Sequence, residues 1–251
     1  MKKVSALLAS LPLITTACGG SSGGGDPAGD FTNTGTLDLS QEKGIWSDTG
    51  TQTFTSPSGK DTTFQAPTAL VTSEEQMIIL TGNSELYIVE AGSDKAYYFS
   101  SFSFNTEIES EASSTTNQFT FSYYNPDREA NGSVSIPADS HYNNEINIDT
   151  YFAGNLWTDT YGPGAWTFTI NSGGGFSANG PAGCNATGNF TNIDITKSEL
   201  AVSLILSGNC SGTYTGLAWP DASDETGTLN IAVYSGLLSS SKALGWKISK
   251  P

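Results

Sequence analysis

The sequence predicts an all-β protein, an antiparallel barrel or sandwich, built as one domain or as two similar small β modules. After residue 36, apolar segments of about four to eight residues follow one another, and many alternate apolar with polar side chains. Gly, Asn and Pro separate these segments, and aromatic residues form 11% of the chain. Short strands between frequent turns are typical of antiparallel barrels and sandwiches.

The first half of the body contains a series of short runs bounded by turn residues. We expect strands near residues 44–46, 69–71, 77–80, 86–89, 97–104, 107–112, 119–123, 132–136 and 146–149. In the run 107–112, Glu107, Glu109 and Glu111 alternate with smaller or apolar residues, so the three carboxylates share one face of the strand.

The second half has the clearer pattern. We expect strands at 166–170, 176–177, 184–190, 192–195, 200–206, 214–219, 228–233 and 243–248. The run 200–206 is mostly apolar, which predicts a central buried strand. Trp46 and Trp166 each stand two residues after a glycine at the start of a half, and this weak echo favours an N-terminal module at 37–160 and a C-terminal module at 161–251.

Residues 1–17 have the order of an export signal. Lys2 and Lys3 precede a short apolar run, and small residues end at Ala17. The apolar run is shorter than the roughly 20 residues that a membrane-spanning helix needs. Residues 19–25 are Gly and Ser, a composition that predicts a flexible tether over residues 18–36.

Cys18 makes the export signal more specific. The residues from Ile14 to Cys18 resemble a bacterial lipobox, although Thr15 stands where Leu is usual. The resemblance implies a diacylglycerol on the Cys18 thiol, cleavage before it and acylation of the new amine, which together anchor the chain in one leaflet. Gly19 and Gly20 favour the outer membrane in such lipoproteins. The alternative is ordinary secretion after Ala17.

The chain is strongly acidic. It carries 10 Lys+Arg and 25 Asp+Glu, a net charge of −15. Removal of Lys2 and Lys3 with the signal leaves a charge of −17 (8 − 25). Such a surface repels nucleic acid, so no nucleic-acid partner is expected. The acidity fits a soluble exterior, the attraction of cations, or a basic partner.

Cys184 and Cys210 remain once Cys18 is assigned to lipid. An even pair in an oxidising compartment predicts a disulfide. Closing a loop of about 26 residues contributes roughly 3 to 4 kcal/mol in the chain-entropy model. The alternative is a metal pair, which lacks accompanying histidines, so we predict no metal and no cofactor.

The segment from Trp166 to Ile248 carries a further pattern of Trp, Gly, Cys and Tyr. Its members are Trp166, Ile170, Gly174 to Ser177, Gly183, Cys184, Gly188, Cys210, Gly212, Tyr214, Gly216 to Ala218 and Gly227 to Leu229. It resembles uncharacterised Gram-negative lipoproteins of β-barrel type. The resemblance implies a barrel fold and an envelope location, and it implies no activity.

The sequence contains no strong catalytic constellation. His141 is the single histidine, and the pattern Gly-x-Ser-x-Gly occurs only within the Gly/Ser-rich stretch 19–24, where no strand precedes it as a nucleophile elbow requires. Glu107, Glu109 and Glu111 could serve a carboxylate-dependent hydrolase, or they form the solvated face of an edge strand. Another acidic group, formed by Asp221, Asp224 and Glu225, could gather calcium, although its spacing is not that of an EF-hand.

Trp46, Trp166 and Trp219 are the aromatic candidates for contact with a ligand, and the alternative is that they fill the core. We therefore predict a non-enzymatic envelope lipoprotein. It is held at the membrane by its lipid, and it binds an envelope protein or a small apolar ligand at an exposed edge or in a barrel mouth. A structural envelope component is the alternative, and a carboxylate-dependent secreted hydrolase is a third hypothesis.

Overall fold

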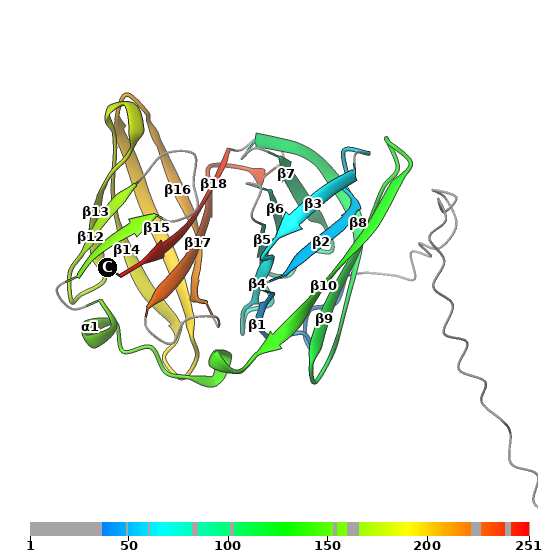
Figure 1. The fold of residues 1–251 in the computed structure, drawn as a ribbon, viewed down its shortest axis with the longest axis horizontal. Coiled ribbons are helices and arrows are strands. Elements are labelled where there is room, and N and C mark those ends of the chain that lie inside the picture. The colour runs from blue at the N-terminus through cyan, green and yellow to red at the C-terminus, as the bar shows by residue number, and fades with distance from the viewer. Residues whose placement is uncertain are drawn as a thin grey trace, which may run out of the picture.

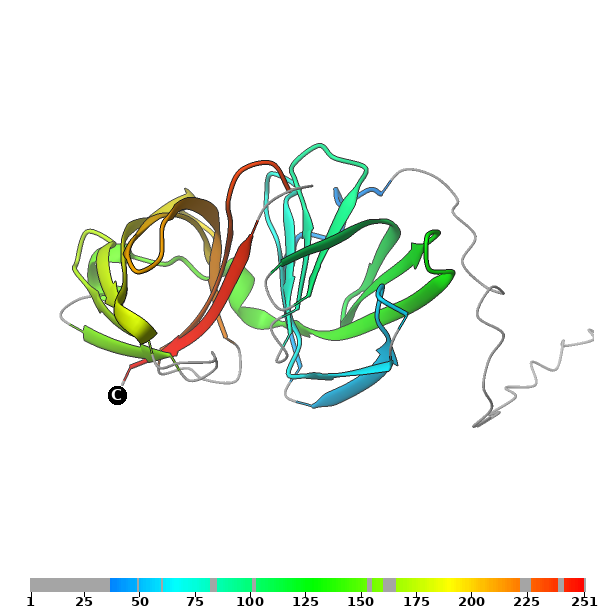
Figure 2. The ribbon, with the colours of Figure 1, turned by 90° about the horizontal axis from the view of Figure 1, so that it is seen from above.

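Two closed eight-stranded antiparallel barrels lie side by side in the computed structural model (Figures 1 and 2), which confirms the all-β prediction of two similar small modules. The structure describes residues 37–48, 50–59, 61–81, 85–100, 103–152, 155–159, 166–221, 227–238 and 242–250. That part of the chain contains no helix long and apolar enough to span a membrane.

The first barrel runs in the order β1-β10-β9-β8-β7-β6-β5-β4 and closes where β1 pairs with β4. Its strands are β1 (Gly44–Ser47), β4 (Thr68–Val71), β5 (Met77–Leu80), β6 (Leu86–Val89), β7 (Ala96–Ser100), β8 (Ser103–Thr115), β9 (Gln118–Asn125) and β10 (Ala130–Asp139). β8 carries the three alternating glutamates and pairs with both β7 and β9. Glu107 pairs in the β7 ladder, whereas Glu109 and Glu111 pair in the β9 ladder. Each glutamate thus has a ladder partner on one side of β8, which is compatible with the solvated-edge interpretation.

The hairpin of β2 (Thr51–Thr55) and β3 (Asp61–Gln65) forms a separate two-stranded sheet that the sequence analysis did not predict. Its turn is tied to the first barrel through β9, because the Tyr123 hydroxyl donates to the Thr55 carbonyl and Asn125 Nδ2 donates to the Pro57 carbonyl at 2.6 Å. Tyr123 belongs to the interior cluster of this barrel. The turn therefore covers the barrel at the end where Tyr123 and Asn125 lie.

The second barrel runs in the order β11 to β18 and closes where β11 pairs with β18. Its strands are β11 (Asn155–Asp159), β12 (Thr167–Ile170), β13 (Gly175–Asn179), β14 (Cys184–Asp194), β15 (Glu199–Gly208), β16 (Gly212–Pro220), β17 (Thr228–Tyr234) and β18 (Ala243–Ser249). β11 thus belongs to this barrel although it precedes the expected module start at residue 161. β11 pairs with β12, and its Trp157 is buried in the core of the second barrel.

Short helical segments occupy the connections. The 3₁₀ turn η1 (Ser140–Asn143) and helix α1 (Ile148–Tyr151) link the barrels, and η2 (Pro181–Gly183) precedes β14. The strand expected at 146–149 is therefore wrong. Asn147 explains the helix, because its side chain accepts the Thr150 N–H as an N-cap.

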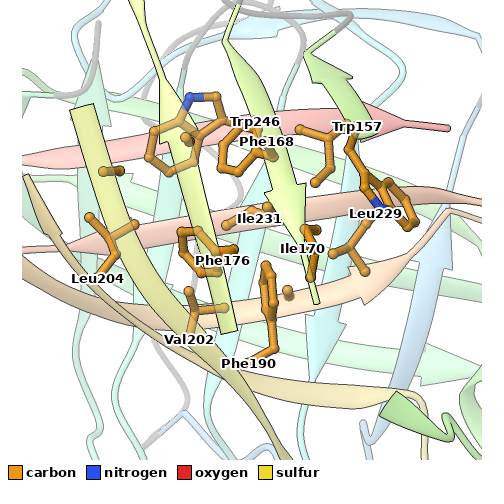
Figure 3. Packing of buried hydrophobic residues seen from close by; sticks show 14 of the residues in the cluster. Trp157, Phe168, Ile170, Phe176, Phe190, Val202, Leu204, Leu229, Ile231 and Trp246 are labelled. Carbon is orange, nitrogen blue, oxygen red and sulfur yellow. The ribbon is translucent and has the colours of Figure 1, made fainter. Parts of the chain in front are cut away.

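Both barrel interiors are filled by side chains. In the second barrel, Trp157, Phe168, Phe176 and Phe190 converge with aliphatic residues from the facing strands (Figure 3). Phe152 joins this cluster and stacks on Phe190 with 5.0 Å between ring centroids. Inward side chains alternate with outward polar ones along most of these strands, as period-two patterning predicts. The described part of each barrel thus has an apolar core of packed side chains.

A third apolar cluster lies between the barrels. It combines Leu70, Ile78 and Leu86 of the first barrel with Trp219 and Ala232 of the second. This contact explains why β5 and β17 are buried at every position. One face of each strand fills its own barrel, and the opposite face packs against the neighbouring barrel.

Polar contacts accompany this interface. The Trp219 indole N–H donates to Thr68 Oγ1 at 2.9 Å. The buried Glu199 carboxylate accepts from the Ser73 backbone N–H at 2.9 Å, from the Ser73 hydroxyl, and from the Tyr142 hydroxyl at 3.2 Å. Three donors thus satisfy one buried charge, as burial of a charge requires.

Candidate functional site

The three candidate tryptophans are packed against protein. Trp46 is buried in the first core and stacks on Phe119 at 5.5 Å, and Trp219 is buried between the barrels. Trp166 is half-buried against Trp246, with 5.6 Å between ring centroids. None of the three lines either surface pocket described below. The ligand-contact role predicted for them has no support in this geometry.

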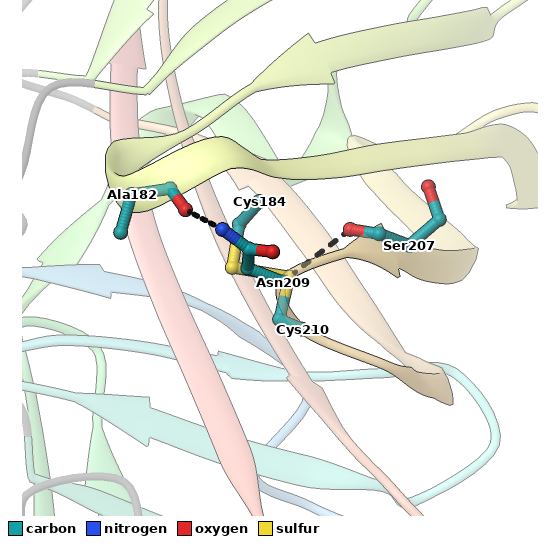
Figure 4. Close-up of a disulfide and its surroundings, with 5 residues drawn as sticks. All are labelled: Ala182, Cys184, Ser207, Asn209 and Cys210. Atoms are coloured by element: carbon teal, nitrogen blue, oxygen red, sulfur yellow. Dashed lines mark hydrogen bonds between the residues drawn. A yellow bond between two sulfur atoms is a disulfide. The ribbon is translucent and has the colours of Figure 1, made fainter.

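The cysteine predictions fall on different parts of the chain. Cys18 lies outside the described residues. Cys184 and Cys210 form a disulfide with 5.2 Å between their Cα atoms, inside the usual range (Figure 4). Asn209 Nδ2 donates to the Ala182 carbonyl at 2.6 Å beside it. The bond joins the start of β14 to the segment between β15 and β16.

The acidic candidates do not form a site. Glu107 lies on the outer surface of the first barrel and pairs with Lys95 at 2.6 Å. Glu109 and Glu111 alternate with it along β8 and line neither pocket. Asp221 is buried against Lys247, while Asp224, Glu225 and the side chain of His141 lie outside the described part. Among the described residues, no three His, Cys, Asp or Glu side chains gather as metal ligands.

A groove of about 900 Å³ lies along β11 to β14 of the second barrel. It is lined by Leu156, Thr169, Ile170, Asn171, Ser172, Gly175, Phe176, Ser177, Thr187 and Gly188. No charged side chain is among them. A smaller hollow of about 560 Å³ on the first barrel is lined in part by Asp38, Glu75 and Asp94.

The shape of the groove depends on two local features. The Asn171 side-chain oxygen accepts the N–H groups of Gly173 and Gly175, both at 3.0 Å, and so holds the turn that leads into β13. Gly188 faces Phe176 across the strand pair, and a Cβ there would overlap the Phe176 ring. The absence of a side chain at Gly188 therefore leaves room for the Phe176 ring.

Outward-facing side chains form rows in register across the second barrel. One row crosses six strands through successive partners, namely Leu156, Thr169, Ser177, Thr187, Ile205 and Thr213. We define the neutral face as the outward residues of β12 to β16 away from the barrel interface, which are Thr167, Thr169, Ser177, Asn179, Asn185, Thr187, Asn189, Thr191, Ser203, Ile205, Ser207, Thr213 and Thr215. The groove lies at the β11–β14 edge of this face.

The neutral face is a local exception in an acidic chain. The five strands β12 to β16 contain only two charged residues, Asp194 and Glu199. Asp194 lies at the end of β14, where it accepts the Thr196 N–H at 2.8 Å, and Glu199 is buried at the barrel interface. The whole chain carries 25 acidic residues against 10 basic ones. Thr, Ser and Asn therefore replace the charges expected on an exposed surface.

A second polar group is enclosed in the first barrel. Glu85 is 7% exposed and accepts the Tyr98 hydroxyl at 2.8 Å. Burial raises the pKa of Glu85, and the Tyr98 hydrogen bond opposes this shift. Burial likewise raises the pKa of Tyr98 and of Tyr123. This group was not predicted, since a single glutamate before an apolar run gives no signal of burial.

The neutral face was also missed as a site, although the strand pattern contained a usable signal. Alternation in 184–190 predicts which residues point outward, but only barrel closure and register align them into rows. The apolar run 200–206 was expected to be a central buried strand, and this is wrong for one face, because Ser203 and Ile205 are exposed on the outside of the barrel. No protein-family model, curated protein or solved structure matches the chain. The likeness to Gram-negative lipoproteins therefore stays a prediction.

Proposed function

We propose that the protein is a non-enzymatic binding lipoprotein of the cell envelope, anchored in the outer membrane through Cys18, with the groove and neutral face of the second barrel as its binding surface. The observation that carries the proposal is a groove of about 900 Å³ on a charge-free face of an acidic molecule. Its volume falls in the range of small-molecule sites.

Because packed side chains occupy the barrel cores, we place the proposed binding site on the outer surface and not in a barrel mouth. A ligand in a barrel mouth would have to displace packed aromatic rings such as Phe176 and Phe190. The hydroxyl groups along the groove also make a purely apolar ligand a poor match.

The carboxylate-dependent hydrolase is not part of the proposal. Paired carboxylates in glycoside hydrolysis flank a bond held between them. Here Glu107 pairs with Lys95 on the outer surface, and the alternating glutamates of β8 are separated from the groove because they lie on the other barrel.

The anchor is tested by metabolic labelling with radioactive palmitate. We expect label on the wild-type protein and none on Cys18→Ser, because the thiol carries the first acyl chains. Equal loading is checked with an antibody against the folded body. An unlabelled wild-type chain would remove the anchor and the outer-membrane location together.

The binding surface is tested in intact cells by photocrosslinking. A photoreactive residue in place of Thr187 lies in the groove, and one in place of Glu109 lies on the outer surface of the first barrel. We expect a covalent adduct from position 187 and none from position 109. Equal adducts from both positions, or none from position 187, would contradict the proposal.

A structural envelope role is the second candidate, and the filled barrels joined by a buried interface favour it. It predicts that deleting the gene raises envelope permeability. A Thr187→Arg variant that folds and restores the barrier would favour the structural role, since it blocks the groove. Failure of this variant to restore the barrier would favour the binding role.

A further inference from the structure

We propose that the groove and the neutral face bind an uncharged, hydroxyl-rich glycan chain. The inference rests on the proposed function, in which the second barrel carries the binding surface, and it names the chemical class of the ligand. Three properties of the face carry it, namely its hydroxyl groups, its lack of charge, and the scarcity of large apolar anchors.

The hydroxyl groups are arranged at a regular spacing. Thr169, Ser177 and Thr187 are successive cross-strand partners, so they stand about 4.8 Å apart on neighbouring strands. Within the described part of the chain, no side-chain hydrogen bond engages these three hydroxyls. Each offers one donor and two acceptor lone pairs to a ligand. A ligand with hydroxyls of its own satisfies both functions at every position.

The charge distribution selects an uncharged ligand. An anionic glycan needs Lys or Arg partners, and the neutral face contains neither. The net charge of −15 repels anions over the rest of the molecule. A cationic ligand would gain more from the acidic strand β8 than from this face. Complementarity therefore favours a neutral polar molecule.

The apolar content of the face is too small for a protein partner. Protein interfaces depend on buried Trp, Tyr and Arg anchors, and no residue of the neutral face is one of these types. Leu156 and Ile205 are the exposed aliphatics of the row, 49% and 57% exposed. Together with threonine methyl groups, they offer narrow apolar contacts that fit the C–H faces of sugar rings between hydroxyl groups.

The scaffold holds this face in place before any ligand arrives. Strands β12 to β16 are each paired on both sides, and the Cys184–Cys210 bond ties β14 to the turn before β16. Such preorganisation lowers the ordering cost of binding. Weak individual hydrogen bonds can then add up along an extended chain.

The test is calorimetric titration of the mature protein in detergent with maltohexaose, cellohexaose, xylohexaose, mannohexaose and chitohexaose. Hexagalacturonate is the anionic comparison. We expect saturable binding of at least one neutral oligosaccharide, an affinity that is independent of salt, and no binding of hexagalacturonate. Absence of binding to all five, or preference for hexagalacturonate, overturns the inference.

Matched variants locate the binding. Ser177→Ala removes a groove hydroxyl and is expected to weaken the neutral oligosaccharide about fivefold, the effect of one hydrogen bond. Ser113→Ala removes an equally exposed serine on β8 and is expected to leave affinity unchanged. Thr187→Arg fills the groove and is expected to abolish binding. Equal effects of the two serine variants would overturn the assignment of the site.

The outcomes separate this inference from the proposed function. If no oligosaccharide binds while position 187 still forms adducts in cells, the glycan is excluded and the binding surface stands. If position 187 forms no adducts either, both the glycan inference and the proposed binding surface are refuted. Sedimentation tests whether a second copy of the protein occupies the groove instead. If the wild type self-associates and Thr187→Arg does not, a second copy is the occupant and the glycan inference is overturned.

Discussion

At the scale of single residues, Glu85 shows most directly how environment changes a side chain. It precedes the apolar strand β6 and is almost fully buried, with Tyr98 as its hydrogen-bond donor. Burial disfavours the charged carboxylate and raises its pKa. The folded protein therefore holds a proton on Glu85 at a higher pH than the unfolded chain does.

This difference predicts a pH-dependent effect of Glu85→Gln. The stability contributed by protonated Glu85 is present below pH 4.5 and is lost as pH rises through the folded-state pKa. Glutamine keeps an acceptor for Tyr98 and cannot ionise. We expect the variant to have a Tm higher than wild type at pH 8 by about 2 to 4 °C, the shift for roughly 1 kcal/mol in a chain of this size.

Thermal melts followed by circular dichroism between pH 4 and pH 8 check this expectation. The advantage of Glu85→Gln should shrink as the pH falls. Glu109→Gln on the outer surface of β8 is the matched control and should show no such trend. A difference from wild type that is constant over the pH range would contradict the role of Glu85.

At the scale of elements, the strands β14, β15 and β16 are held by two devices. The ladder between β14 and β15 pairs residues from Cys184 to Asp194, with a bulge near Asn192. The disulfide then closes the end of this ladder against the turn into β16. Together they keep the outward residues of the neutral face in register.

Removal of the disulfide is expected to lower stability without changing the strand arrangement. Cys184→Ala with Cys210→Ala should reduce the free energy of unfolding by about 3 to 4 kcal/mol, because the unfolded chain regains the entropy of a loop of roughly 26 residues. Urea denaturation measures the change, and reduction of the wild type should reproduce it. Identical midpoints for oxidised and reduced wild type would refute this expectation.

At the scale of the whole molecule, the buried interface makes the two barrels one body. Figure 2 shows β17 and β18 of the second barrel beside the first barrel, and an isolated bridge between Ser103 and Lys242 adds a backbone contact. Glu199 is the central polar residue, since its carboxylate accepts hydrogen bonds from Ser73 and Tyr142. Loss of its charge should therefore weaken the coupling between the barrels.

Glu199→Gln tests this coupling. An amide has one acceptor oxygen where the carboxylate has two, so at least one donor is left unsatisfied in the interface. We expect about 2 kcal/mol of destabilisation, the value of a hydrogen bond to a charged group. Calorimetry should show one unfolding transition for wild type and two for the variant, with the exposed Glu109→Gln as control. A single transition at an unchanged midpoint would count against the role of Glu199.

The sequence by itself determined the strand character of most segments and their inward and outward faces. The alternation at 166–170 and the all-apolar run at 77–80 were readable from local pattern. These features depend on neighbours along the chain, since side chains alternate with a fixed period and each run carries its own hydrophobicity.

The tertiary structure alone decided which segments meet. Closure into two barrels, the β2–β3 hairpin over one barrel end and the membership of β11 all come from pairings between distant segments. The same holds for the rows of the neutral face, because register aligns Leu156 with Thr213 across six strands. Such contacts depend on the packing free energy of the whole chain, and local sequence does not encode that quantity.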